Sequence, residues 1–96
     1  MKRVIISPAA AKDLEDIRAF IAQDSVRNAD RVVREIRRAF QKLAKMPGMG
    51  HLREDLASER VRFWTVYSYH IIYRADVKPL QIMRVIHGAR NIEGLF

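Results

Sequence analysis

The chain has 96 residues, 49% of them hydrophobic and 30% charged, which is typical of a single globular domain over residues 1–96. This composition excludes a disordered chain, and no apolar run approaches the ~18 residues of a membrane span. Eighteen lysines and arginines against eleven acidic residues give a net charge of +7, so a nucleic acid, an acidic protein or plain solvent could face the basic surface.

The cysteine and histidine counts restrict the chemistry further. Without cysteine, the chain has no disulfide framework, no thiol nucleophile and no cysteine zinc site. Three histidines argue against a histidine metal site, and we expect neither a metal nor a cofactor. The apolar run after the first charged residues is too short for a signal peptide, so we expect a cytoplasmic protein with no membrane association.

The chain begins with a predicted strand and a predicted helix. Arg3–Ser7 is a short β-branched run, and Ser7-Pro8 has the residues of a helix start, because serine caps free N–H groups and proline loses no needed donor. The helix is expected to end near Asp24. One apolar stripe defines its buried face: Ala10, Leu14, Ile17 and Ile21. The acidic residues of its first half, Asp13 among them, are interpreted as favourable charges near the positive end of the helix dipole.

The segment from Ser25 to Met46 has the strongest helical pattern in the sequence. Ser25 is the cap candidate, and Pro47-Gly48 ends the helix. Apolar residues recur there at intervals of four and three: Ala29, Val33, Ile36, Phe40 and Leu43. Because the connection between the two helices is short, they are predicted to form an antiparallel hairpin that can cover one face of a sheet.

A loop and three strands complete the predicted fold. Residues 47–60 lack a clean period and begin with turn residues, so a loop is expected there. Strands are predicted at Val61–Val66, Tyr69–Ala75 and Leu80–His87, and their short connections favour antiparallel pairing. The order strand-helix-helix-strand-strand-strand predicts an α+β fold, with the helical hairpin packed on one face of a four-stranded, mostly antiparallel sheet.

The face of the sheet opposite the helices, called the far face below, has no predicted cover. In the strand 69–75, alternation places Tyr69, Ile71 and Tyr73 on one side. In the last strand, strict alternation separates two sets: Met83, Val85 and His87 on one face, and Leu80, Ile82, Arg84 and Ile86 on the other. Neither face is purely polar, so exposed apolar surface is expected on the far face, and with it a partner or an oligomer.

Six cations, called the basic row below, follow the second predicted helix: Arg27, Arg31, Arg34, Arg38, Lys42 and Lys45. At about 100° per residue they lie on one line opposite the apolar stripe. The row could bind phosphates, or it could be a solvated face with local ion pairs, for which Asp30–Arg34 and Arg31–Glu35 have the i,i+4 spacing. We prefer the solvated face, and direct binding of nucleic acid stays open.

A second cationic set gathers near the ends of the last strands: Arg74, Arg84, His87 and Arg90. Such groups could hold a scissile phosphate and move its proton, or they could guard sheet edges against aggregation. No Ser-His-Asp order, phosphate loop or metal-binding spacing accompanies them. The residue types alone leave these alternatives open.

Several segments also have a familiar form. They read Tyr-His-Ile-Ile-Tyr-Arg at 69–74 and Arg-Val-Ile-His-Gly-Ala-Arg-Asn at 84–91, and the N-terminal Ser-Pro-Ala-Ala at 7–10 and the Pro-Gly turn at 47–48 agree with them. Together they resemble the RelE/ParE superfamily of type II toxin–antitoxin toxins, and the ParE branch in particular. The resemblance covers nearly the whole chain.

This resemblance implies a bacterial toxin that is encoded beside a neutralising antitoxin. RelE-like members cut messenger RNA on the ribosome without a metal, whereas ParE-like members poison DNA gyrase and are not nucleases. RelE-like enzymes place a functional tyrosine about six positions after an arginine; Arg90 matches that arginine, but Phe96 has no hydroxyl. The resemblance therefore favours a ParE-like gyrase inhibitor, with a RelE-like ribosome-dependent endoribonuclease as the alternative.

We expect inhibition by protein–protein contact with gyrase, and neutralisation by an acidic, partly disordered antitoxin segment. A homodimer or a toxin–antitoxin heterotetramer is the assembly that the resemblance implies. The predicted contact surface combines the far face and the C-terminal tail: Arg74, Arg84, His87, Arg90, Ile92, Leu95 and Phe96. In a nuclease, the arginines Arg74, Arg84 and Arg90 would instead stabilise charge on the phosphate. His87 would then be the acid or base.

Overall fold

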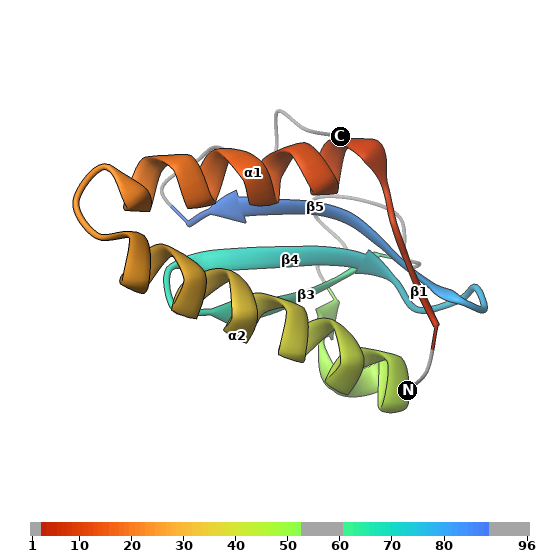
Figure 1. Cartoon of the computed structure of the whole chain (residues 1–96). Helices are drawn as coiled ribbons and strands as arrows, with labels where there is room; N and C mark the ends of the chain where they lie inside the picture. The colour runs from red at the N-terminus through yellow and green to blue at the C-terminus, as the bar shows by residue number, and fades with distance from the viewer. Residues whose placement is uncertain (1–2, 53–60, 89–96) are drawn as a thin grey trace.

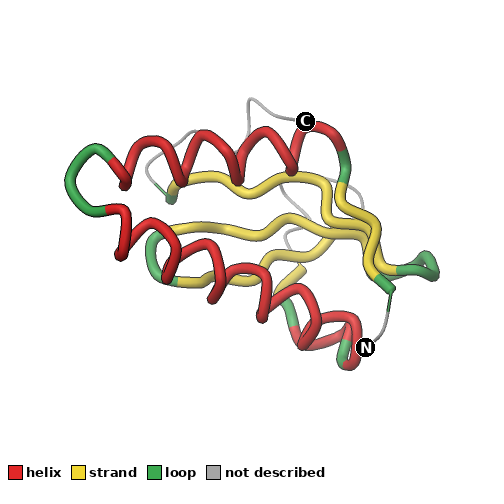
Figure 2. The backbone as a smooth tube through the Cα atoms, viewed as in Figure 1, coloured by secondary structure: helices red, strands yellow, loops and turns green. Residues whose placement is uncertain are grey.

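Two helices lie on one face of a mixed sheet in the computed structural model, which describes residues 3–52 and 61–88 (Figures 1 and 2). The described elements follow in chain order: β1 Val4–Ile6, α1 Pro8–Ala22, α2 Val26–Lys45, a 3₁₀ turn η1 Pro47–Met49, β2 His51–Leu52, β3 Val61–Val66, β4 Tyr69–Arg74 and β5 Leu80–His87. The predicted α+β class and the helical hairpin are confirmed. No helix among these residues is both long and apolar enough to cross a membrane.

The described strands lie in the order β1-β5-β4-β3-β2. β1 pairs parallel with β5, whereas the other neighbours pair antiparallel. The described sheet has one strand more than the four predicted, because His51 and Leu52 pair with β3 inside the segment expected to be a loop. A strand of two residues is too short to produce a period in the sequence.

Serines begin both helices, as predicted. Ser7 Oγ accepts a hydrogen bond from the Ala10 N–H at 3.0 Å and donates to the Met83 carbonyl at 2.7 Å. Ser25 Oγ accepts from the Asn28 N–H at 3.1 Å. Ser7 therefore caps α1 and also ties the start of this helix to β5, whereas Ser25 only caps its own helix.

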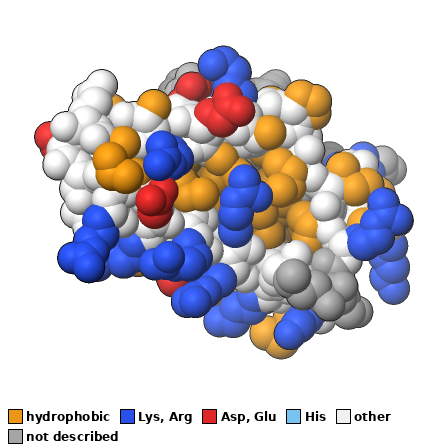
Figure 3. All heavy atoms as spheres, viewed as in Figure 1, with side chains coloured by type: hydrophobic (Ala, Val, Ile, Leu, Met, Phe, Trp, Pro, Cys, Tyr) orange, Lys and Arg blue, Asp and Glu red, His pale blue; other side chains and the backbone are white. Residues whose placement is uncertain are grey.

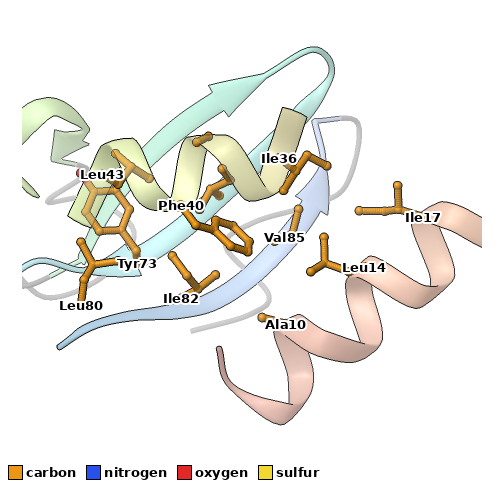
Figure 4. Packing of buried hydrophobic residues seen from close by; sticks show 12 residues of the cluster. Ala10, Leu14, Ile17, Ile36, Phe40, Leu43, Tyr73, Leu80, Ile82 and Val85 are labelled. Atoms are coloured by element: carbon orange, nitrogen blue, oxygen red, sulfur yellow. The ribbon is translucent and has the colours of Figure 1, made fainter. Parts of the chain in front are cut away.

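The main core lies between the helical hairpin and the sheet (Figure 4). Both predicted stripes supply it, since Leu14 and Ile17 of α1 and Ile36 and Leu43 of α2 are buried. The strands contribute the residues that face them: Ile71, Tyr73, Leu80, Ile82 and Val85. Burial of these side chains fixes the hairpin on the sheet.

Tyr73 connects this core to the segment after α2. Its side chain is fully buried, and its Oη donates to the Pro47 carbonyl at 2.7 Å and accepts from the Gly50 N–H at 2.9 Å. A side chain at Gly50 would collide with Tyr73 Oη and with the Phe63 carbonyl oxygen. The glycine therefore allows the close approach that holds η1 against β4.

A second apolar cluster occupies the far face: Val61, Phe63, Ile72 and Ile86. The far face is thus partly apolar, as predicted. However, these four side chains are at most 6% exposed in the single chain. The expected exposed apolar surface is therefore not found at these residues. Their burial does not require a partner protein.

A β-bulge interrupts the pairing of β5 with β4. Ile72 lies opposite Arg84, whereas the next residue, Tyr73, lies opposite Ile82. Met83 is therefore an extra residue in β5, with no counterpart in β4. Such a residue shifts the register by one position for the rest of the strand.

The bulge changes which face each residue of β5 occupies. The core clusters show the result: Leu80, Ile82 and Val85 on the helix side, and Met83 and Ile86 on the far face. The prediction that grouped Val85 with Met83, apart from Leu80 and Ile82, is therefore wrong. Strict alternation holds only in a strand with no inserted residue.

Candidate functional site

Arg84 directly follows the bulge residue Met83 and binds a carboxylate of α1. Its Nε and Nη2 donate to the two oxygens of Asp13 at 2.8 and 2.9 Å, and the Val85 N–H donates to Asp13 Oδ2 at 2.9 Å. Asp13 is 8% exposed. The hydrogen bond to Asp13 raises the pKa of Arg84.

The position of Asp13 follows from the short β1. This strand pairs with β5 only as far as Ile82, and no other strand within residues 3–52 and 61–88 pairs with this edge of β5 beyond that residue. Ser7 then bonds the Met83 carbonyl, and Asp13 accepts from the Val85 N–H. Two side chains thus replace the missing strand as partners for the backbone of β5.

Arg74 is held by a different carboxylate at the end of β4. Its Nε and Nη2 donate to Asp76 Oδ1 and Oδ2 at 3.1 and 2.8 Å. This hydrogen bond and the charge of Asp76 raise the pKa of Arg74. Two of the predicted site arginines, Arg74 and Arg84, therefore already bind carboxylates of their own chain.

His87 ends β5 beside a pocket. Its ring meets the ring of Tyr69 edge to face, with 5.4 Å between ring centroids, and burial raises the pKa of the Tyr69 phenol. The pocket has a volume of about 350 Å³ and lies between α1 and the ends of β4 and β5. Ile17 and Phe20 line its α1 side, and the Phe20 side chain is 70% exposed. An apolar side chain of a partner would fit this hollow.

Two described members of the predicted set, Arg74 and His87, lie far apart. Tyr69 pairs with His87, and Arg74 pairs with Gln81 at the other end of the same ladder. Five residues of strand separate these two pairs, which is about 16 Å at ~3.3 Å per residue. Arg74 and His87 therefore cannot act on one small group together.

The rest of the predicted set lies outside the described residues: Arg90, Ile92, Leu95 and Phe96. No group of three or more histidine or acidic side chains among the residues that the structure describes is arranged to hold a metal ion.

The predicted ion pairs of the basic row have different partners. Asp30 accepts from Arg18 Nε of α1 at 3.0 Å, and Glu35 accepts from Arg38 at 2.9 Å. The expected pairs were Asp30–Arg34 and Arg31–Glu35. Asp30 instead joins the two helices of the hairpin, which is a contact that spacing within one helix does not predict.

Asp13 is the residue that the sequence reasoning missed. We interpreted it only as a charge near the start of α1, whereas it is buried and organises β5. A signal was present, since Asp13 lies three residues after Ala10 and directly before Leu14, within the apolar stripe. A charge at such a position is buried only when it is paired.

The arrangement as a whole is a helical hairpin on a twisted mixed sheet, with a pocket beside the last described strand. The same fold occurs in a chain of the solved structure titled "Chromosomal ParDE TA system from P. aeruginosa", with a TM-score of 0.74 over 91% of this chain and 96% of that chain. The two sequences are 22% identical, so this comparison establishes the class of fold.

Sequence comparisons define the family. The family model described as the ParE toxin of the type II toxin–antitoxin system parDE matches residues 4–92. Toxin ParE1 of Caulobacter vibrioides is 33% identical over 92 residues, which cover 95% of this chain and 94% of that protein. Toxin ParE3 of the same organism is 27% identical over 93 residues, which cover 96% of this chain and 92% of that protein. The chain therefore belongs to the ParE family of type II toxins, as its resemblance predicted.

Proposed function

We propose that this ParE-family toxin inhibits DNA gyrase by protein–protein contact in the cytoplasm. One observation favours gyrase inhibition over a RelE-like nuclease activity. Arg74 and His87 lie at opposite ends of the β4–β5 ladder, and Arg74 and Arg84 each bind a carboxylate. A nuclease needs preorganised cations that converge on one phosphate. The described part of the predicted nuclease set lacks that convergence, which supports a toxin that acts by binding.

A cognate antitoxin is the second proposed partner. The solved neighbour belongs, by its title, to a ParDE toxin–antitoxin system. The net charge of +7 favours an acidic antitoxin segment, and the pocket beside Phe20 and His87 offers an apolar anchor point. Arg74, Arg84 and His87 stay predicted contact residues. A homodimer or a toxin–antitoxin heterotetramer stays the predicted assembly.

The test measures both candidate activities in parallel. Purified chain is added to gyrase and relaxed plasmid, and separately to a translation reaction in which message integrity is followed. We expect loss of supercoiling, accumulation of cleaved DNA and intact messages. Intact supercoiling together with cut messages would contradict the proposal and favour the endoribonuclease.

The variant His87→Gln separates the two functions by magnitude. If His87 is one surface contact, its loss should weaken gyrase inhibition by no more than about tenfold, which corresponds to ~1.4 kcal/mol of binding. If His87 were a general acid or base, its loss should reduce activity by about 10²–10⁴-fold. His51→Gln, on exposed β2, is the matched control and should retain full inhibition.

A further inference from the structure

Most of the net charge of the chain resides on one helix. α2 carries seven cations against two acidic residues, Asp30 and Glu35, which gives +5 of the total of +7. α1 carries two cations against three acidic residues, which gives −1. A basic surface that served only solubility would not need this separation between two neighbouring helices.

The cations of α2 form an exposed line. Each member of the basic row is exposed, while the opposite side of α2 is buried on the sheet. From Arg27 to Lys45 the row extends for about 27 Å at 1.5 Å per residue, and neither glycine nor proline interrupts the helix. Figure 3 shows lysine and arginine side chains gathered along the α2 side of this face.

Little negative charge compensates the row. Asp30 is held by Arg18 of the other helix, and Glu35 by Arg38. Arg31 bonds the neutral side chain of Asn28. Among the residues in the described ranges, no carboxylate lies within ion-pair distance of the rest of the row: Arg27, Arg34, Lys42 and Lys45.

A groove beside the row concentrates the guanidinium groups. It has a volume of about 410 Å³, with Val33, Asp30 and Gln41 in its lining. Four arginines surround it: Arg18, Arg34, Arg37 and Arg38. Arg18 and Arg38 are held by Asp30 and Glu35, whereas Arg34 and Arg37 have no ion-pair partner among the described residues. The planar fork of arginine matches the oxygens of a phosphate, so Arg34 and Arg37 are the groups of this groove that suit a phosphate.

We propose that the outer face of α2 binds the sugar–phosphate backbone of duplex DNA. A protein partner would require an apolar centre in the interface, but the exposed residues between the ends of this row are charged or polar. A straight row of cations fits instead the regular charge of a duplex, which carries one phosphate per ~1.7 Å of its axis. Phosphate contacts carry no sequence information, so the binding is non-specific.

Duplex DNA is favoured over other polyanions because the proposed target acts on it, and the inference rests on the proposed function to that extent. Bound in this way, α2 would hold the toxin on the DNA segment that gyrase engages. The far face and the pocket beside His87 lie on other sides of the fold and stay available for protein contacts.

The test is a salt titration without gyrase. Anisotropy of a fluorescein-labelled, mixed-sequence duplex of about 20 base pairs is measured with the full chain between about 50 and 200 mM salt. The variant R31Q/R34Q/R38Q should bind at least about tenfold more weakly at the lowest salt. Its salt slope should be lower by about three, one for each phosphate contact removed.

The matched control removes the same charge elsewhere. Arg3, Lys12 and Lys78 are exposed and lie outside α2, so R3Q/K12Q/K78Q should keep the slope within about one of the unmodified chain. Thermal unfolding of both variants verifies that they fold. Equal weakening by both variants, or no binding by the unmodified chain, would overturn the proposal.

Competitors decide the class of polyanion. Unlabelled DNA should displace the labelled duplex more effectively than polyglutamate or duplex RNA of equal charge; the reverse order would overturn the assignment to DNA. The supercoiling assay stays separate. A chain that binds the duplex without inhibiting gyrase supports DNA binding by α2 and contradicts the proposed function. A chain that inhibits gyrase without binding the duplex supports the proposed function and contradicts DNA binding by α2.

Discussion

Among single residues, Tyr73 has the clearest structural task. Its buried hydroxyl satisfies the Pro47 carbonyl and the Gly50 N–H, so Tyr73→Phe leaves two polar backbone groups without their partner. We expect a loss of about 1–3 kcal/mol in the free energy of unfolding, measured by urea denaturation. Tyr67→Phe is the control, because Tyr67 is 59% exposed, and it should change stability by less than about 0.5 kcal/mol. Equal effects would contradict this account.

The same pair of variants gives a dependence on pH. Burial raises the pKa of Tyr73, although the Gly50 hydrogen bond and the charge of Arg62 oppose the rise. The folded chain therefore holds the phenol proton more tightly than the unfolded chain. This contribution is fully present below about pH 10 and is lost as the pH rises through the folded pKa. As the pH rises above about 10, the free energy of unfolding should consequently fall less for Tyr73→Phe than for the unmodified chain.

The pair Asp13–Arg84 is expected to act as one unit. The side chains are 9% and 26% exposed, so Asp13→Asn or Arg84→Gln should each cost about 1.5–3 kcal/mol of unfolding free energy. The double variant should cost less than the sum by about 1–2 kcal/mol, measured by a denaturation cycle. Asp16→Asn is the control, since its pair with Lys12 is exposed. Strict additivity of the two changes would refute the coupling.

Single residues differ in how well the sequence predicts them. The caps Ser7 and Ser25 were predictable, because capping depends on the next three residues alone. The partners of Asp13 and Arg84 were not, because they lie 71 residues apart in the sequence. The separation of Arg74 from His87, in contrast, follows from the predicted antiparallel pairing of their strands, because Arg74 lies near the turn and His87 at the opposite end of the ladder.

Among the elements, the start of α1 carries the most specific expectation. Ser7→Ala removes a helix cap and also the bond to the Met83 carbonyl, and we expect a loss of about 2 kcal/mol. Ser25→Ala removes a cap alone and should cost about 1 kcal/mol. Thermal unfolding resolves this difference, since 1 kcal/mol corresponds to about 4–8 °C in a domain of this size. Equal losses would mean that the bond to Met83 contributes nothing to stability.

Helices were more predictable than strands for a physical reason. The apolar stripes of α1 and α2 repeat over 15 and 20 residues, so the sequence of each helix alone indicates which face is buried. β2 has two residues, and the bulge at Met83 is a single insertion. Both arise from pairing with a neighbouring strand, and neither leaves a period in the sequence.

In the whole molecule, the order of the elements predicted the two layers, but it did not predict that β1 pairs with β5. Two consecutive helices followed by a run of strands define an α+β fold, and the family resemblance led to the same class. The parallel pairing of β1 with β5 joins Val4 to Leu80, two residues from opposite ends of the sequence. Such a contact follows from the packing of the hairpin on the sheet and has no local sequence signal.

The pairing of β1 with β5 also determines when, during synthesis, the chain can complete its sheet. The ribosome makes β1 and the helical hairpin first, but β5, the strand between β1 and β4, is made last of the described strands. Until Leu80–Ile82 have left the exit tunnel, Val4–Ile6 have no strand to pair with, and α1 has no sheet to cover. A chain whose synthesis stops before β5 therefore lacks the strand that joins β1 to the rest of its sheet, and the fold of this ParE-family toxin cannot form until β5 has been made.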